Sequence, residues 1–188
     1  MPIEELIIAP CDIFLIRDEN LIGRLVRLFE SDPDKSNISV SHTGLFVGET
    51  CGITEAICIE TRNVVKLAKF FQEYHNKNKL VAIYRPLNLT SLESSLIIRK
   101  AQTFVGHKYG YLKILTHFLD YFLNGKVFFR KLCKDDTTPI CSWVVARSFE
   151  AICLDFGVES YAANPENIYD FCKNNPDKYL CLYELGKI

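Results

Sequence analysis

The sequence has no CxxC pair, although it contains eight cysteines. The closest cysteines, Cys51 to Cys58 and Cys133 to Cys141, do not have the spacing of a zinc finger or zinc ribbon. The eight residues are scattered through apparent strands and helices, in a chain too long to need disulfide crosslinks. We therefore expect reduced thiols and no structural metal site.

Long apolar runs and an excess of one charge are also absent. No run approaches the roughly 18 to 20 residues that cross a bilayer, and 22 basic residues balance 23 acidic ones. Residues 1–14 lack the basic start, long apolar stretch and small-residue cleavage site of a secretory signal. We expect a cytoplasmic protein without a transmembrane segment and without a field that attracts nucleic acid. Peripheral membrane contact and a homodimer stay open.

The chain contains no internal repeat, flexible linker or low-complexity segment, so residues 1–188 are expected to form one domain. Apolar periodicity, capping signals and turn residues predict an alternation of strands and helices. The expected strands are 12–16, 40–47, 53–59, 80–84 and 179–182, and the expected helices are 18–30, 90–105, 111–123, 139–153 and 164–172. This order predicts an α+β domain with a mainly antiparallel sheet packed against helices.

Cys141 lies at the expected start of a helix, just after Thr137-Thr138-Pro139. Proline is favoured at the first helical position because no donor is needed there. Amides and the positive end of the helix dipole at such a position stabilise a thiolate, which is the nucleophilic form of cysteine. The alternative is a small apolar residue that packs a helix end, since free cysteine is among the most buried residue types.

His42 begins an otherwise apolar strand in the segment 41–48, where its imidazole can face a cleft. It is the candidate base for Cys141, and the alternative is a hydrogen-bonded structural histidine. Glu55 stands in the next strand, which a hairpin at 48–52 would bring beside His42. A carboxylate there would orient the imidazole. Glu60 lies on the opposite strand face from Glu55, and either glutamate can instead be an exposed strand residue.

Several blocks along the chain resemble one known family. They are Asp12-Ile13-Phe14-Leu15, Ser41-His42-Thr43-Gly44-Leu45-Phe46-Val47-Gly48, Glu55-Ala56, Tyr84-Arg85-Pro86, Gly106-His107-Lys108-Tyr109 and Cys141-Ser142. In order and spacing they resemble the YiiX/YaeF-like permuted papain-like amidases of the NlpC-type superfamily of cysteine peptidases and acyltransferases. The resemblance spans nearly the whole chain and implies a circularly permuted papain-like fold, in which the histidine precedes the cysteine.

The same resemblance implies roles for four residues. Cys141 would attack, His42 would act as base and then acid, and Glu55 would take the orienting position. Tyr109 matches a tyrosine near the nucleophile whose hydroxyl helps to hold the oxyanion. Two departures from the family pattern are Cys11, where relatives commonly carry glycine, and Gly110, where an aspartate is frequent.

The expected chemistry is acyl transfer through a thioester, which requires neither a metal nor an organic cofactor. The leading hypothesis is a cysteine amidase or peptidase acting on a peptide, isopeptide or other small amide. A lipid acyltransferase or thiol phospholipase is the alternative, because residues 116–136 form an aromatic-rich and basic segment that reads as an insertion. A binding protein that retains the fold without turnover is the alternative from another class.

Overall fold

The computed structural model describes residues 5–18, 24, 40–51, 53, 56–61, 63–74, 79–122, 128, 131 and 135–186 of the 188-residue chain. Apart from Asp18 and Arg24, the helix expected over 18–30 lies outside these residues. The strands are β1 (Ile7–Ile8), β2 (Ile13–Ile16), β3 (His42–Phe46), β4 (Thr50–Cys51), β5 (Ile57–Thr61), β6 (Val65–Lys69), β7 (Leu80–Pro86) and β8 (Tyr179–Glu184). The helices are α2 (Phe70–Tyr74), α3 (Ser91–Thr103), α4 (Tyr111–Phe122), α6 (Cys141–Glu150) and α7 (Pro165–Asn174).

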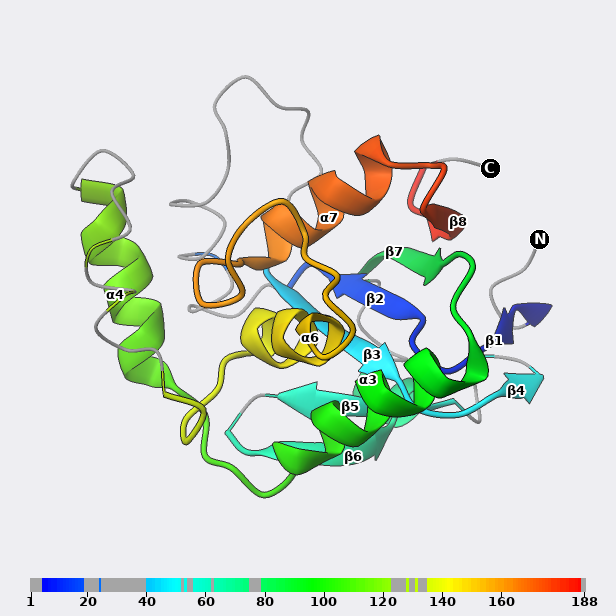
Figure 1. The fold of residues 1–188 in the computed structure, drawn as a ribbon, viewed down its shortest axis with the longest axis horizontal. Coiled ribbons are helices and arrows are strands. Elements are labelled where there is room, and N and C mark those ends of the chain that lie inside the picture. Colours follow the sequence, from blue (N-terminus) through cyan, green and yellow to red (C-terminus); the bar gives the residue numbers. More distant parts are fainter. Residues whose placement is uncertain are drawn as a thin grey trace.

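Six strands form one sheet in the order β6-β5-β3-β2-β7-β8, and each neighbouring pair is antiparallel. Strands β1 and β4 form a separate two-stranded pair. In Figure 1, α6 crosses in front of the sheet, with α3 and α7 on the same side and α4 at one side of the molecule. The expected α+β class with an antiparallel sheet is confirmed.

Hydrophobic side chains form one core on each face of the sheet. The larger core packs α3, α6 and α7 against one face and includes Leu15, Leu45, Trp143 and Phe149. The smaller core lies on the other face, where α2 contributes two aromatic rings; it includes Phe14, Ile16, Phe46, Phe70 and Tyr74. All four residues of β2 are therefore buried, which is why its sequence is apolar throughout rather than alternating.

Two helix starts follow directly from local sequence. Thr90 caps α3 through a reciprocal capping box with Glu93, as its spacing predicts. Asn164 caps α7 in the same way with Asn167, and Pro165 occupies the first turn. Both helix starts can be predicted from the sequence because the capping partners are only three residues apart.

The connection between β3 and β5 differs from the expected tight hairpin at 48–52. Thr50 and Cys51 pair with β1, and β5 begins only at Ile57. The register pairs Leu45 with Ile59 and Phe46 with Cys58. The longer connection shifts β5 along β3 relative to a hairpin closed at 48–52, and in this register Glu60 reaches His42.

Two blocks that carried the family resemblance meet in an ion pair. Both oxygens of the fully buried Asp12 carboxylate accept hydrogen bonds from Arg85, at 2.8 and 2.7 Å. One oxygen also accepts the Ala9 amide at 2.8 Å. Burial raises the pKa of Asp12, and the hydrogen bonds from Arg85 oppose that effect. This pair ties β7 to the start of β2 and takes no part in the site described below.

Within the described part of the chain, none of the helices combines the length and the apolar character needed to cross a bilayer.

Gly44 is the point at which β3 has no room for a side chain. A Cβ there would lie 2.3 Å from Cζ of Phe14 and 2.6 Å from the backbone oxygen of Ile59. We predict that Gly44→Ala lowers the free energy of unfolding by about 2 to 3 kcal/mol, because a ring and a backbone must both move. Urea denaturation measures this loss.

Gly48 provides the matched control, since a Cβ built on it meets nothing within 4 Å. Gly48→Ala should change stability by no more than about 1 kcal/mol. Equal losses in the two variants would contradict the steric explanation.

Candidate active site

Cys141 is the first residue of α6, as the sequence predicts, but Pro139 lies before the helix rather than opening it. The residue at the N-cap is Ile140, whose side chain makes no capping hydrogen bond. The N-cap side chain therefore does not occupy the amides of the first turn, which are suited to a negative charge. Cys141 itself is only 5% exposed.

His42 is the first residue of β3, the strand on which α6 packs. Cys141 lies close enough to the imidazole to help raise the pKa of His42. Nε2 of His42 lies 3.1 Å from Oε2 of Glu60, which is fully buried. The structure thus brings the predicted nucleophile and the predicted base together, in a setting that excludes most water.

Aromatic rings surround the imidazole on the α2 side of the sheet. The rings of Phe14 and Tyr74 each lie 6.4 Å from the His42 ring, centroid to centroid, in tilted orientations. Phe14 can lie there because Gly44 leaves its space empty. These contacts limit the orientations that the imidazole can adopt.

The charge on His42 is set by its neighbours. Burial acts to lower the pKa of His42, but its interactions with the Glu60 carboxylate and with Cys141 outweigh that effect. The net effect raises the pKa of His42 above its ordinary value of 6.5. The neighbouring Glu60 and Cys141 therefore favour the protonated form of the imidazole.

Among the described residues, Glu60 is the carboxylate that contacts His42. Glu55 lies outside the described residues, in the segment before β5 begins at Ile57. Side chains alternate along strands, so Glu60 shares a face with Cys58, while His42 shares a face with Phe46, the partner of Cys58. The sequence-based choice of Glu55 assumed a tight hairpin at 48–52, whereas β5 begins only at Ile57.

Tyr74 is a member of the site that the sequence did not indicate. Its hydroxyl donates a hydrogen bond to Oε2 of Glu60, the same oxygen that faces His42. Tyr74 comes from α2, a five-residue helix that no periodicity predicted. In the sequence, Glu60 is marked only as the one acidic residue of the mostly apolar strand β5.

Tyr109 is half-buried and lies beside the segment that leads into α6. The Gly110 amide donates to the carbonyl of Pro139 at 3.0 Å, and the Tyr109 amide donates to the carbonyl of Asn63. The Tyr109 ring packs edge-on against Tyr111, with centroids 4.9 Å apart. The role expected for its hydroxyl at an oxyanion stays a prediction.

The departure at Gly110 has a steric reason. A Cβ on Gly110 would lie 2.1 Å from the carbonyl oxygen of Thr138. Any side chain, including an aspartate, would push the 138–140 segment away. The glycine therefore allows the close backbone contact that precedes Cys141.

Polar contacts tether the loop 135–140 to α6 and α4. Asp136 accepts a hydrogen bond from the Trp143 indole at 2.8 Å, and Lys100 also contacts its carboxylate. Lys113 is buried, donates to the backbone oxygen of Asp135 and lies 3.9 Å above the Trp143 ring. Trp143 is two residues from Cys141, so these contacts hold the start of α6 in place.

The start of β3 is tethered in a similar way. The Val40 amide donates to Oε2 of Glu166 on α7 at 2.9 Å. Ser41 accepts the amide of Asp18 at 2.8 Å through its hydroxyl. On the α6 side, the Ser142 hydroxyl donates to the carbonyl of Ala163 at 2.8 Å. Both halves of the site are therefore anchored next to the reacting side chains.

Other described groups do not join the site. His107 contacts the backbone oxygen of Asp136 through Nδ1 and packs on Phe104. A cavity of about 640 Å³ lies at the far end of α6, between Glu150 and Ala162, and is not lined by Cys141 or His42. Among the residues that the structure describes, no group of three or more potential metal ligands gathers.

Comparison with models of known protein families finds none that matches this chain, and a search of curated proteins finds no match either.

The electrostatic role of Glu60 is testable by titration. We predict that Glu60→Gln lowers the pKa of His42 toward 6.5, because the largest charge that raises it is removed. Imidazole NMR signals followed against pH measure this pKa. Glu159→Gln, an exposed change far along the chain, should leave the His42 titration unaltered.

Stability provides a second readout of the same pKa. The pKa of His42 is higher in the folded protein than in the unfolded chain, so its stabilising effect is complete below about pH 6.5 and is lost as the pH rises through the folded-state value. Unfolding free energy should fall over this range more steeply for the wild type than for Glu60→Gln. Parallel curves would contradict the assigned ion pair.

Gly110 offers a test of how the segment before α6 is held. We predict that Gly110→Ala lowers stability by about 2 kcal/mol or more, since the new methyl group meets a carbonyl oxygen. The variant should also slow alkylation of Cys141, because the start of α6 moves. Gly48→Ala serves as control, and unchanged alkylation in Gly110→Ala would show that the two are not linked.

Proposed function

We propose that this chain is a cysteine-dependent hydrolase that cleaves an amide through a thioester acyl-enzyme. The observation that carries the proposal is the buried contact of three groups: a thiol at a helix start, an imidazole at a strand start, and a carboxylate behind the imidazole. A nucleophile, a base and an orienting group in this spatial order form the arrangement that activates thiols and hydroxyls in many unrelated enzymes.

In the proposed reaction, the Cys141 thiolate attacks the carbonyl carbon and the carbonyl oxygen becomes an oxyanion. Amides at the start of α6 are the candidate donors to this oxyanion, since no side chain caps them. Protonated His42 then gives its proton to the leaving amine as the carbon–nitrogen bond breaks. The neutral imidazole next removes a proton from water, which attacks the thioester and releases the acid and the free thiol.

Glu60 acts in this scheme as a positioning residue. Its carboxylate faces His42 Nε2 and stabilises the imidazolium, while the Tyr74 hydroxyl holds the carboxylate oxygen from the other side. Glu60 thus takes the role that the family resemblance assigned to Glu55. Tyr109 is retained as the candidate that assists the oxyanion, because its backbone neighbour Gly110 contacts Pro139 next to α6.

The proposed fold is the circularly permuted papain-like arrangement within a single domain. Two features support it: the histidine precedes the cysteine in the chain, and α6 carries the cysteine against the strand that begins with the histidine. The sheet order and the antiparallel pairing agree with that arrangement but are not specific to it.

A lipid acyltransferase or thiol phospholipase is the second candidate, and one observation favours it. Leucines on α4 are exposed close to the segment that enters the site, at 64% for Leu112 and 51% for Leu115. An apolar surface beside a thiol nucleophile suits an acyl-chain substrate. A binding protein without turnover would need none of the charge stabilisation around His42.

Thiol reactivity separates an enzyme from a binding protein. We predict that limiting iodoacetamide labels Cys141 at least about tenfold faster than Cys153 and Cys181, although only the latter two are exposed. His42→Ala should remove this preference, because the imidazolium that stabilises the thiolate is lost. Peptide mass spectrometry gives the rate at each cysteine.

The opposite result is labelling in order of solvent exposure, in which Cys153 and Cys181 react before Cys141. That order would reject the catalytic assignment. Cys153→Ala provides a matched control and should leave Cys141 labelling unchanged. Intact-mass analysis after incubation with peptide and acyl-lipid mixtures then identifies the acyl group, and a fatty acyl thioester would replace the amide proposal by the lipid one.

A further inference from the structure

Among the α4 side chains that the structure describes, several polar ones are buried and several apolar ones are exposed, although Ile114 packs against the core. Its buried side chains include Lys113, Thr116 and Asp120, at 3%, 6% and 0% exposure. The contact of Lys113 with the Trp143 ring directs this polar face toward α6. An amphipathic helix normally packs its apolar face on the core.

The exposed stripe on α4 consists of Tyr111, Leu112, Leu115 and Leu119, which are 50%, 64%, 51% and 37% exposed. Residues three and four apart lie on one face of a helix, so these four side chains form a continuous strip. Single exposed leucines are ordinary on a protein surface, but a contiguous apolar strip marks a surface that contacts an apolar phase or partner.

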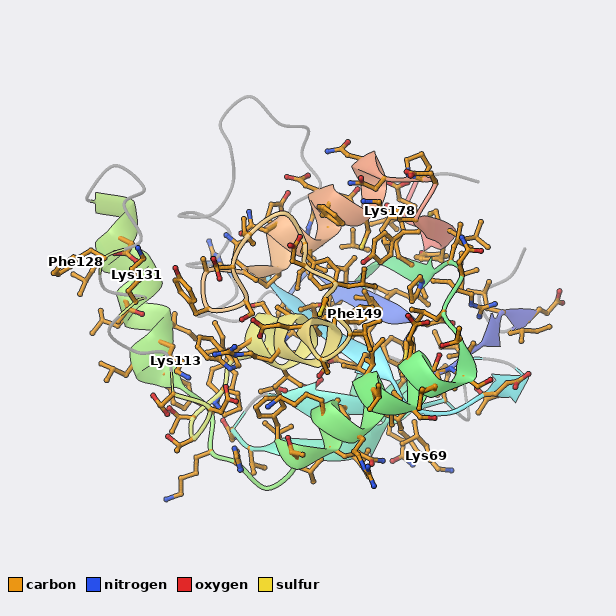
Figure 2. All side chains as sticks on the ribbon, in the orientation of Figure 1. Lys69, Lys113, Phe128, Lys131, Phe149 and Lys178 are labelled. Carbon is orange, nitrogen blue, oxygen red and sulfur yellow. The ribbon has the colours of Figure 1, made fainter. Side chains whose placement is uncertain are left out.

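Basic charge lies next to the apolar strip. Phe128 is 58% exposed and projects away from the body of the molecule beside α4, and Lys131 is exposed in the same region (Figure 2). Between Asp120 and Asp135 the sequence contains four basic residues and no acidic one. Leucines and aromatic rings together with a basic segment of the chain are typical of helices that lie on anionic membranes.

The structure assigns α4 to a peripheral membrane contact, in which the helix lies in the plane of an anionic lipid surface with Leu112, Leu115 and Leu119 inserted. A helix of 12 residues is about 18 Å long, too short to span the bilayer but sufficient to lie on it. The buried Lys113 and Asp120 face the protein and would not enter the lipid.

A second copy of the chain is the competing occupant of this face. A two-fold contact places the same patch of both copies together, so the Lys131 cations of the two copies would lie in one interface. Like charges across an interface oppose association, whereas anionic headgroups attract them. The charge distribution therefore favours the membrane.

Because α4 lies next to the segment that leads to Cys141, membrane docking of α4 would bring lipid close to the candidate active site. This step alone rests on the proposed function. The helix begins one residue after Gly110, whose amide bonds to Pro139 just before Cys141. A membrane against α4 would present acyl-linked headgroups near the nucleophile. Docking itself requires no turnover, so the two proposals can fail separately.

Vesicle flotation tests the docking with the full chain, using phosphatidylcholine alone and phosphatidylcholine with roughly one-third phosphatidylserine. Cys141→Ser is run beside the wild type so that lipid turnover plays no part. Both should float with the anionic vesicles, stay behind with the neutral ones, and dissociate as salt is raised. Leu112→Glu with Leu115→Glu should lower the bound fraction about tenfold or more, and Lys131→Glu should lower it less.

Leu92→Glu with Leu180→Glu is the matched control, because these leucines are 70% and 47% exposed on other elements. It should bind like the wild type. Circular dichroism checks folding, and Leu115→Glu alone replaces the double variant if that variant misfolds. No flotation of the wild type, or equal loss in the control, overturns the proposal. Concentration-dependent dimers that Leu112→Glu with Leu115→Glu disrupts, without flotation, would assign the face to a second copy instead.

Discussion

The arrangement of the candidate site depends on one contact, the packing of the N-terminal end of α6 against the start of β3. This contact places a buried imidazole between a thiol and a carboxylate. A protonated imidazole out of water is costly unless acceptors compensate it, and here both neighbours can carry negative charge. The three groups therefore stabilise one another only while the helix and the strand keep their relative position.

Much of the surrounding structure holds that position. Glu166 on α7 binds the backbone just before His42, and Ser142 binds the loop before α7, so α7 supports both halves of the site. On the opposite side, Asp136 holds the Trp143 indole. Two close backbone approaches, at Gly44 and Gly110, are allowed only because these residues lack a side chain.

Helix α4 is oriented differently from a helix that packs its apolar face on the core. Its polar face contacts the loop that leads to Cys141, through Lys113 and Asp135, and its apolar strip faces outward. The helix thus connects the exterior of the molecule to the entrance of α6. Packing on the described core does not explain an apolar strip that faces outward. The proposed lipid surface accounts for this strip together with the exposed Lys131.

The sequence by itself determined the elements whose signals are local: the capped helices α3 and α7, the apolar strand β2, and the placement of Cys141 at a helix start and His42 at a strand start. Only the tertiary structure decided which carboxylate meets His42, because a strand register depends on the length of the connection, and Thr50 and Cys51 pair with β1 instead of closing a hairpin. Tyr74 and the outward strip of α4 were likewise beyond sequence periodicity, which reports that a helix has two faces but not which of them the rest of the chain will cover.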